Sequence, residues 1–219
     1  MSMKYQYTFL QMVADIKYDL MRYQFRLSRS WIALLLLFPG LQALIAYRIS
    51  HWLNIREKLG NPIWWPIAIF DLLLTRLIEI FTGIQLHPTA QIGRGLYLPH
   101  FGGVVIGEGV ILGDNCDIYQ HTTLGYSGMD DETGGYPRIG NRVLILAGAV
   151  VSGGITVGSD VMIGANAVVI ESVPDRAVVG GVPAKILSKK GTFTAIHYPG
   201  LESDLERKES IKLANIDSS

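Results

Sequence analysis

A period of six residues organises the stretch from Leu86 to Pro174. A small aliphatic residue recurs at every sixth position, and a glycine or another small residue often follows it. Read in sixes, the stretch is LHPTAQ, IGRGLY and LPHFGG, then, after a slip of two residues, IGEGVI, LGDNCD and IYQHTT; it resumes as IGNRVL, ILAGAV, VSGGIT, VGSDVM, IGANAV and VIESVP. A period of six fits neither the 3.6 residues of an α-helix nor the two of an ordinary strand.

A β-helix is the fold whose sequences carry such hexapeptides. Each six forms one short strand and one corner, and three sixes form one coil that stacks about 4.8 Å from the next. The aliphatic residues are expected to point inward: Ile92, Ile106, Leu112, Ile118, Ile139, Ile145, Val157 and Ile163. A sandwich or barrel would show less regular spacings of about 8–12 residues. We therefore expect a mainly β protein built on a parallel β-helix.

Composition excludes several classes of protein. The formal net charge is zero over 219 residues, and the absence of a basic block argues against nucleic acid as a partner. A single cysteine, Cys116, excludes a disulfide framework or a cysteine-rich zinc site within one chain. No secretory signal is visible, so we expect a cytoplasmic location.

Residues 1–83 are expected to form an α-helical subdomain, whose last helix ends near Thr82-Gly83. The apolar segment 31–47 approaches the length of a membrane span, but Pro39-Gly40 interrupts it. A second apolar segment, 62–74, is also short. We favour helices that pack on each other or on another subunit. The alternative is that residues 31–74 contact a membrane surface.

Residues 84–187 are assigned to the β-helix, and residues 188–219 to a polar tail with a short exposed helix at 201–215. The polar, glycine-rich stretch 125–138 has no aliphatic period and is expected to leave a corner as a loop. A loop on a rigid scaffold is a common place for substrate contacts.

Several ordered motifs resemble the hexapeptide-repeat acyltransferases, specifically the serine acetyltransferase branch. The resemblance covers about residues 35–187. Its markers are FPGLQALIAYRISHWL, FTGIQLHPTAQIGRGLYLPHFGGVVIGEGVIL, QHTTLG, IGNRVLILAGAVVSGGITVGSDVMIGANAVV and VPDRAVVGGVPAKIL. It implies a left-handed coil, homotrimers that sometimes pair as a dimer of trimers, and acetyl-CoA bound between neighbouring β-helices, with no metal.

The family's catalytic histidine corresponds to His100 in LPHFGG. The resemblance implies that it acts as general base, removing the proton of an acceptor hydroxyl that attacks the thioester directly; histidine, with an ordinary pKa of about 6.5, suits this role. Gly102 and Gly103 are candidates for holding the oxyanion. His121 is the alternative base, whereas His87, His51 and His197 are expected to be structural or solvated.

Four positions depart from the serine acetyltransferase pattern. Gln85 replaces the acidic residue that orients the base, and Glu108 is a candidate to supply the missing carboxylate. Pro99 replaces a second aspartate, and Gly135-Tyr136 replaces an Arg-His pair that holds the carboxylate of the amino acid. Glycine cannot replace the paired contact of a guanidinium with a carboxylate.

These departures lead us to expect an acceptor without the serine carboxylate, as in the branch members that acetylate sugar hydroxyls in polysaccharide synthesis. Tyr126, Tyr136 and Tyr119 are candidates to stack on a sugar ring. The positions matching the coenzyme site are Gly125, Ala147, Gly148, Ala165 and Lys185.

The leading hypothesis is therefore an acetyl-CoA-dependent O-acetyltransferase acting on a sugar or polysaccharide precursor. L-serine O-acetylation is the alternative. A non-catalytic β-helix assembly protein is a third hypothesis, for which Gln85 and Pro99 would be signs of decay.

Overall fold

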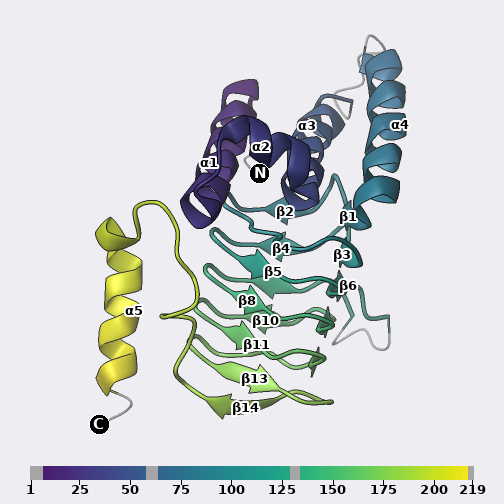
Figure 1. The fold of residues 1–219 in the computed structure, drawn as a ribbon. Helices are drawn as coiled ribbons and strands as arrows, with labels where there is room; N and C mark the ends of the chain where they lie inside the picture. The colour runs from purple at the N-terminus through teal and green to yellow at the C-terminus, as the bar shows by residue number, and fades with distance from the viewer. Residues whose placement is uncertain (1–6, 58–63, 129–133, 217–219) are drawn as a thin grey trace, which may run out of the picture.

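A helical region caps one end of a stack of short strands, and a last helix lies along the side of that stack (Figure 1). The computed structural model describes residues 7–57, 64–128 and 134–216. The helical end lies beside the first coils, so residues far apart in the sequence meet there.

The first four helices begin and end at residues that are typical of helix termini. They are α1 (Phe9–Leu27), α2 (Trp31–Leu37), α3 (Pro39–Glu57) and α4 (Trp65–Thr82). Thr8 caps α1 in a capping box, and Ser30 accepts the Ala33 N–H at the start of α2. The expected break at Pro39 separates α2 from α3, whose axes differ by 91°. Gly83, at φ +64°, ends α4 in the left-handed conformation that glycine favours.

The strands form three sheets that the chain visits in turn. The first contains β1 (Ile84–Leu86), β3 (Val104–Ile106), β6 (Thr123–Gly125), β9 (Val150–Ser152) and β12 (Val168–Val169). The second contains β2 (Gln91–Ile92), β4 (Ile111–Leu112), β7 (Arg138–Ile139) and β10 (Thr156–Val157). The third contains β5 (Asp117–Ile118), β8 (Leu144–Ile145), β11 (Met162–Ile163), β13 (Val178–Gly180) and β14 (Lys185–Ser188).

The strand pairing confirms the parallel coil and rules out a sandwich. All the pairs of named strands are parallel except the last, β13 with β14, which is antiparallel. The eight aliphatic residues expected to point inward are all buried, none more than 7% exposed. They belong to one continuous hydrophobic cluster that runs through the stack and reaches α3 through Leu44 and Tyr47.

The two-residue slip in the period has a structural cause. Before it, Tyr97 pairs with Asp117, twenty positions on; after it, Val105 pairs with Thr123, eighteen positions on. The first coil therefore uses two more residues than the next at the corner between them. Those residues widen the loop that carries His100.

The chain after β14 differs from the expected polar tail. It returns along the third sheet, where Ile196 and Tyr198 are buried against Leu144. The helix α5 (Leu205–Ile216) is fixed by Arg207, 1% exposed, which lies in an ion-pair cluster with Asp160 and Arg142. The sequence did not predict this packing, because the residues that anchor α5 are charged and do not recur at a regular spacing.

Helix α4 exposes an unusually apolar surface. Ten large apolar side chains on it are between 42% and 76% exposed: Trp65, Ile67, Ile69, Phe70, Leu72, Leu73, Leu74, Leu77, Ile80 and Phe81. Of the helices in the described residues, none alone has the length and apolar character of a membrane span, whereas α2 with most of α3 passes that test only as a bent pair.

Candidate active site

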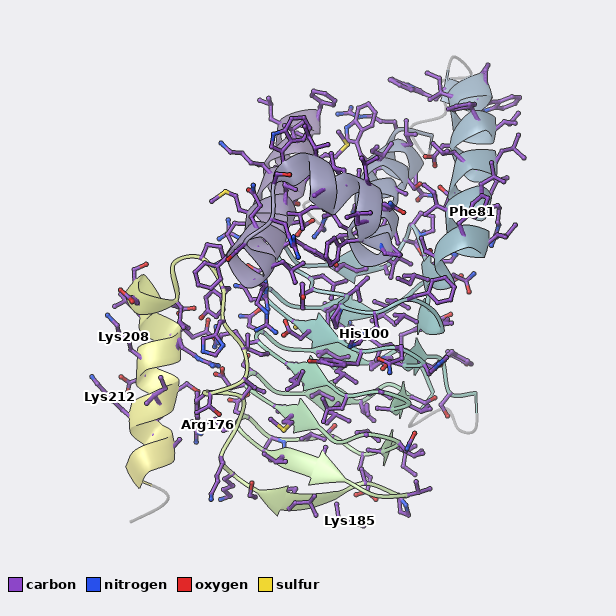
Figure 2. All side chains as sticks on the ribbon, in the orientation of Figure 1. Phe81, His100, Arg176, Lys185, Lys208 and Lys212 are labelled. Atoms are coloured by element: carbon purple, nitrogen blue, oxygen red, sulfur yellow. The ribbon has the colours of Figure 1, made fainter. Side chains whose placement is uncertain are left out.

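His100 lies at the edge where the chain passes from the third sheet to the first (Figure 2). Its side chain is exposed, and its ring centroid is 5.4 Å from that of Tyr119 in the next coil. Within the described residues no hydrogen bond involves the His100 imidazole. The ring is therefore open to a substrate approaching from this edge.

The loop that carries His100 depends on its glycines. Gly102 and Gly103 have φ values of +87° and +71°, in the left-handed region that side chains disfavour. A Cβ at Gly103 would lie 2.2 Å from Nδ1 of His121, so the two residues are in close contact. The Gly102 N–H donates to the Thr82 carbonyl, 3.0 Å away, which ties the loop to the end of α4.

The third residues of three hexapeptides form one column down this edge, below the loop of His100. They are Gln120 in IYQHTT, Ala147 in ILAGAV and Ala165 in IGANAV. Gly102 continues the column in the first coil, where its carbonyl accepts the His121 N–H, 3.2 Å away. The Gly148 N–H donates to the Gln120 carbonyl, 3.0 Å away, and the Asn166 N–H donates to the Ala147 carbonyl, 2.9 Å away. The structure thus brings His100, His121 and three of the expected coenzyme positions (Ala147, Gly148 and Ala165) to the same edge.

Gln120 is a residue of this edge that was not among the candidates expected from the sequence. A signal was present, since Gln120 occupies the same place in its hexapeptide as His100 does in LPHFGG. His121 beside it drew attention as the more familiar catalytic residue type.

A different edge, between the first and second sheets, carries Glu108, Gly125, Tyr126 and Tyr136. Glu108 follows the end of β3, whereas the His100 loop precedes its start. The Tyr136 ring lies on this turn, where a Cβ at Gly109 would be 2.2 Å from it. The pKa of Tyr136 is raised, by desolvation first and by the Glu108 carboxylate second. Glu108 of one chain therefore lies away from His100 of the same chain.

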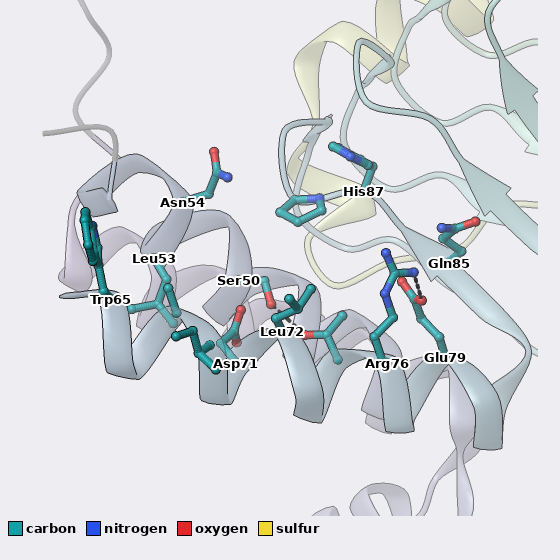
Figure 3. A pocket seen from close by; sticks show the side chains of 14 residues that line it. Ser50, Leu53, Asn54, Trp65, Asp71, Leu72, Arg76, Glu79, Gln85 and His87 are labelled. Atoms are coloured by element: carbon teal, nitrogen blue, oxygen red, sulfur yellow. Dashed lines mark hydrogen bonds and ion pairs between the residues drawn. The ribbon is translucent and has the colours of Figure 1, made fainter. Parts of the chain in front are cut away.

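Gln85 lies between these two edges, on the outward face of β1 opposite Val105. It lines a pocket of about 480 Å³ between α3, α4 and the first coil, together with His87, Asp71 and the paired Arg76 and Glu79 (Figure 3). Burial raises the pKa of Asp71, an effect that its hydrogen bond with Ser50 opposes.

The remaining candidates lie at different distances from His100. Lys185 starts β14 at the far end of the stack, with its side chain 65% exposed. Pro99, beside His100, cannot donate a backbone N–H. His87 braces its turn through Thr89, 2.8 Å away, and His51 contacts the Pro88 carbonyl at 2.7 Å. The part of the insertion at 129–133 lies outside the described residues.

Cys116 is buried and its thiol is held protonated. Burial raises its pKa to about 12, despite the nearby Arg22. A thiolate nucleophile at this position is therefore unavailable at neutral pH. Among the described residues no three His, Cys, Asp or Glu side chains are grouped to bind a metal.

Comparisons with known proteins agree with this geometry. Residues 136–171 match the family model described as bacterial transferase hexapeptide (six repeats). The chain is 43% identical over 162 residues to a serine acetyltransferase of Helicobacter pylori, covering 74% of this chain and 89% of that protein. It is 38% identical over 164 residues to one of Synechococcus elongatus, covering 75% of this chain but only 63% of the relative.

A solved structure of a serine acetyltransferase is also similar to this chain. The crystal structure of a Brucella abortus serine acetyltransferase in complex with coenzyme A superposes with a TM-score of 0.71 at 32% identity. The match covers 84% of this chain and 70% of that one. It includes helical segments as well as the coils, because the coils alone make up a smaller share of the chain.

Proposed function

Because the chain belongs to the serine acetyltransferase family of hexapeptide transferases, we propose that it transfers the acetyl group of acetyl-CoA to the hydroxyl of L-serine. The chain is an acetyl-CoA-dependent acyltransferase. The observation that carries the choice of acceptor is the 43% identity to a serine acetyltransferase across 89% of that protein's length.

The expectation of a sugar or polysaccharide acceptor is wrong. Relatives at 38–43% identity and the superposed structure are all named serine acetyltransferases. The expectation rested on Gln85, Pro99 and Gly135-Tyr136, but a missing arginine does not reveal which group takes its place. The Tyr136 ring also packs on the turn around Gly109 instead of standing free as a platform for a sugar. Family membership likewise argues against a non-catalytic assembly protein.

In the proposed reaction His100 accepts the hydroxyl proton of serine as the serine oxygen attacks the thioester carbonyl. The carbon–sulfur bond then breaks, and the imidazolium returns the proton to the leaving CoA sulfur. The Gly102 N–H is already engaged by Thr82, which leaves the Gly103 N–H as the backbone donor for the oxyanion. His121 remains the alternative base, since it lies against Gly103.

The coenzyme is proposed to lie along the column below His100, beside Ala147, Gly148 and Ala165. Small side chains there leave the backbone open to a slender thiol arm. Gly125 and Lys185 stay in the proposal as more distant contacts, and the coil is taken as left-handed, as the family implies.

A homotrimer is the proposed working form, in which copies of the chain cover α4. Its exposed apolar surface is on the order of 1,000 Å², compared with about 800 Å² per partner in a standard interface. The side chain of Phe101, 61% exposed, extends apolar surface next to His100. A neighbour would therefore lie close to the catalytic edge, where it could present its Glu108 or Gln85 to His100.

The test of function is release of free CoA thiol by the purified full chain. Acetyl-CoA is supplied with L-serine, with glucose as a sugar control, or alone. We expect saturable release that depends on L-serine, with little release in the other two mixtures. If CoA binds but L-serine does not stimulate release, the proposed acceptor is contradicted.

A further inference from the structure

Gln120 lies one coil below the loop of His100, at the edge where the chain passes from the third sheet to the first. After the slip, Gly102 stacks on Gln120, since the His121 N–H donates to the Gly102 carbonyl, 3.2 Å away. His100, two residues earlier in the same loop, has its ring centroid 5.4 Å from that of Tyr119, the residue before Gln120. Coils of this kind stack about 4.8 Å apart. Below Gln120 the same column continues with two alanines, so no large side chain separates it from a ligand lying along this edge.

The side-chain oxygen of Gln120 is a buried acceptor without a donor. Its Oε1 is shielded from solvent and has no hydrogen-bond partner among the described residues, although the residue as a whole is only half-buried. A buried polar group left unpaired is destabilising, so such groups are rare and call for an explanation. The torsion that turns a glutamine carboxamide is broad, so a small rotation can aim this oxygen at a ligand.

The donor that fits this place is a neutral amide N–H. Coenzyme A carries such a group two methylene units from its sulfur, a separation comparable with the spacing of one coil. A thioester placed with its carbonyl at His100 therefore brings that N–H to the level of Gln120. We propose that the Gln120 carboxamide oxygen accepts a hydrogen bond from the first amide N–H of the pantetheine arm.

This inference rests on the proposed function, because it assumes that the acyl donor lies along the column below His100. It makes Gln120 a binding residue for the donor and gives it no role in proton transfer. Loss of the Gln120 side chain should therefore weaken the binding of the coenzyme and leave the KM for L-serine and the pH–rate profile unchanged.

The experiment measures CoA affinity by calorimetry and steady-state kinetics for the full-length chain and three variants. Gln120→Leu removes the acceptor, whereas Gln120→Glu keeps an acceptor of the same length. Gln91→Leu is the matched control, since Gln91 is an exposed glutamine on β2 of another sheet.

We expect Gln120→Leu to bind CoA about threefold to tenfold more weakly, with the KM for acetyl-CoA raised by the same factor. Gln120→Glu and Gln91→Leu should stay within twofold of the parent protein. The KM for L-serine and the shape of the pH–rate profile should not change in any of them.

Two results would overturn the inference. One is CoA affinity unchanged in Gln120→Leu; the other is equal weakening by Leu and Glu, which would mean that glutamine acts as a donor. A change confined to the pH–rate profile would assign Gln120 to His100 instead. By contrast, failure of the parent protein to bind CoA would contradict the proposed function itself, so the two failures are distinguishable.

Discussion

At the scale of single residues, the proposed chemistry depends on one exposed imidazole. His100→Ala should lower kcat with L-serine about 10²–10⁴-fold, because a general base contributes on that order. The KM for acetyl-CoA should change little. His121→Ala is the matched variant from the same edge, and stopped assays of thiol release measure both. A larger loss in His121→Ala than in His100→Ala would exchange their assigned roles.

Gly103 supplies a second test at this scale. Gly103→Ala places a Cβ 2.2 Å from Nδ1 of His121, at a φ of +71° that costs a side chain about 1–2 kcal/mol. We expect at least a tenfold loss of kcat and a lower free energy of unfolding. Gly180→Ala is the control, since its nearest neighbour is the flexible end of Leu187 at 3.1 Å. Full activity in Gly103→Ala would show that the His100 loop tolerates movement.

At the scale of elements, the period of six was sufficient to place most of the strands. Ile106, Leu112 and Ile118 point inward as expected, because the repeat fixes which residue of each six faces the core. The slip before Ile106 also marked the loop of His100. The packing of α1 against the coils could not be predicted from the period of six. Arg22 pairs with Asp117 across 95 positions, and no local pattern links two charges so far apart.

The helix of the final segment was expected, but its packing against the third sheet was not, for the same reason. Its anchors, Arg207 and Thr192, are polar residues buried by partners elsewhere in the chain. The place of Gln120 in its hexapeptide can be read from the sequence, but its unpaired acceptor is visible only once its surroundings are known. The hexapeptides were sufficient to predict that Gln120, Ala147 and Ala165 share one edge, whereas the separation of Glu108 from His100 needed the geometry of β3.

The docking of the final segment should depend on pH. Although burial raises the pKa of Asp204, the hydrogen bonds from Tyr198 and the Arg207 N–H, with Arg142 nearby, lower it overall below its ordinary 3.8. A carboxyl with a lowered folded pKa stabilises the fold above pH 3.8, and this contribution is lost as the pH falls through the folded value.

Asp204→Asn should therefore lower the free energy of unfolding at pH 7 by about 0.5–1.5 kcal/mol. The difference from the parent protein should shrink towards pH 3. Urea titrations followed by circular dichroism at both pH values provide the measurement, with Glu202→Gln as an exposed control. A difference of the same size at both pH values would show that the Asp204 charge is not responsible.

At the scale of the whole molecule, we propose that the exposed surface of α4 mediates the assembly of the trimer. Leu73→Glu puts a charge in the middle of this surface, where Leu73 is 61% exposed, and should shift light-scattering mass from the trimer towards the monomer. Leu205→Glu is the control, since Leu205 on α5 is 78% exposed. Activity should fall with the trimer if a neighbour completes the site. A parent protein that is monomeric and binds anionic lipid vesicles through α4 would instead favour the membrane-surface alternative.

The measurement that tests the central claim most directly is identification of the product by mass spectrometry. The parent protein, incubated with L-serine and acetyl-CoA labelled with carbon-13 in the acetyl group, should form labelled O-acetylserine in a one-to-one ratio with free CoA. His100→Ala should form almost none while still binding CoA. Undiminished product from His100→Ala, or consumption of acetyl-CoA without acetylated serine, would contradict the account.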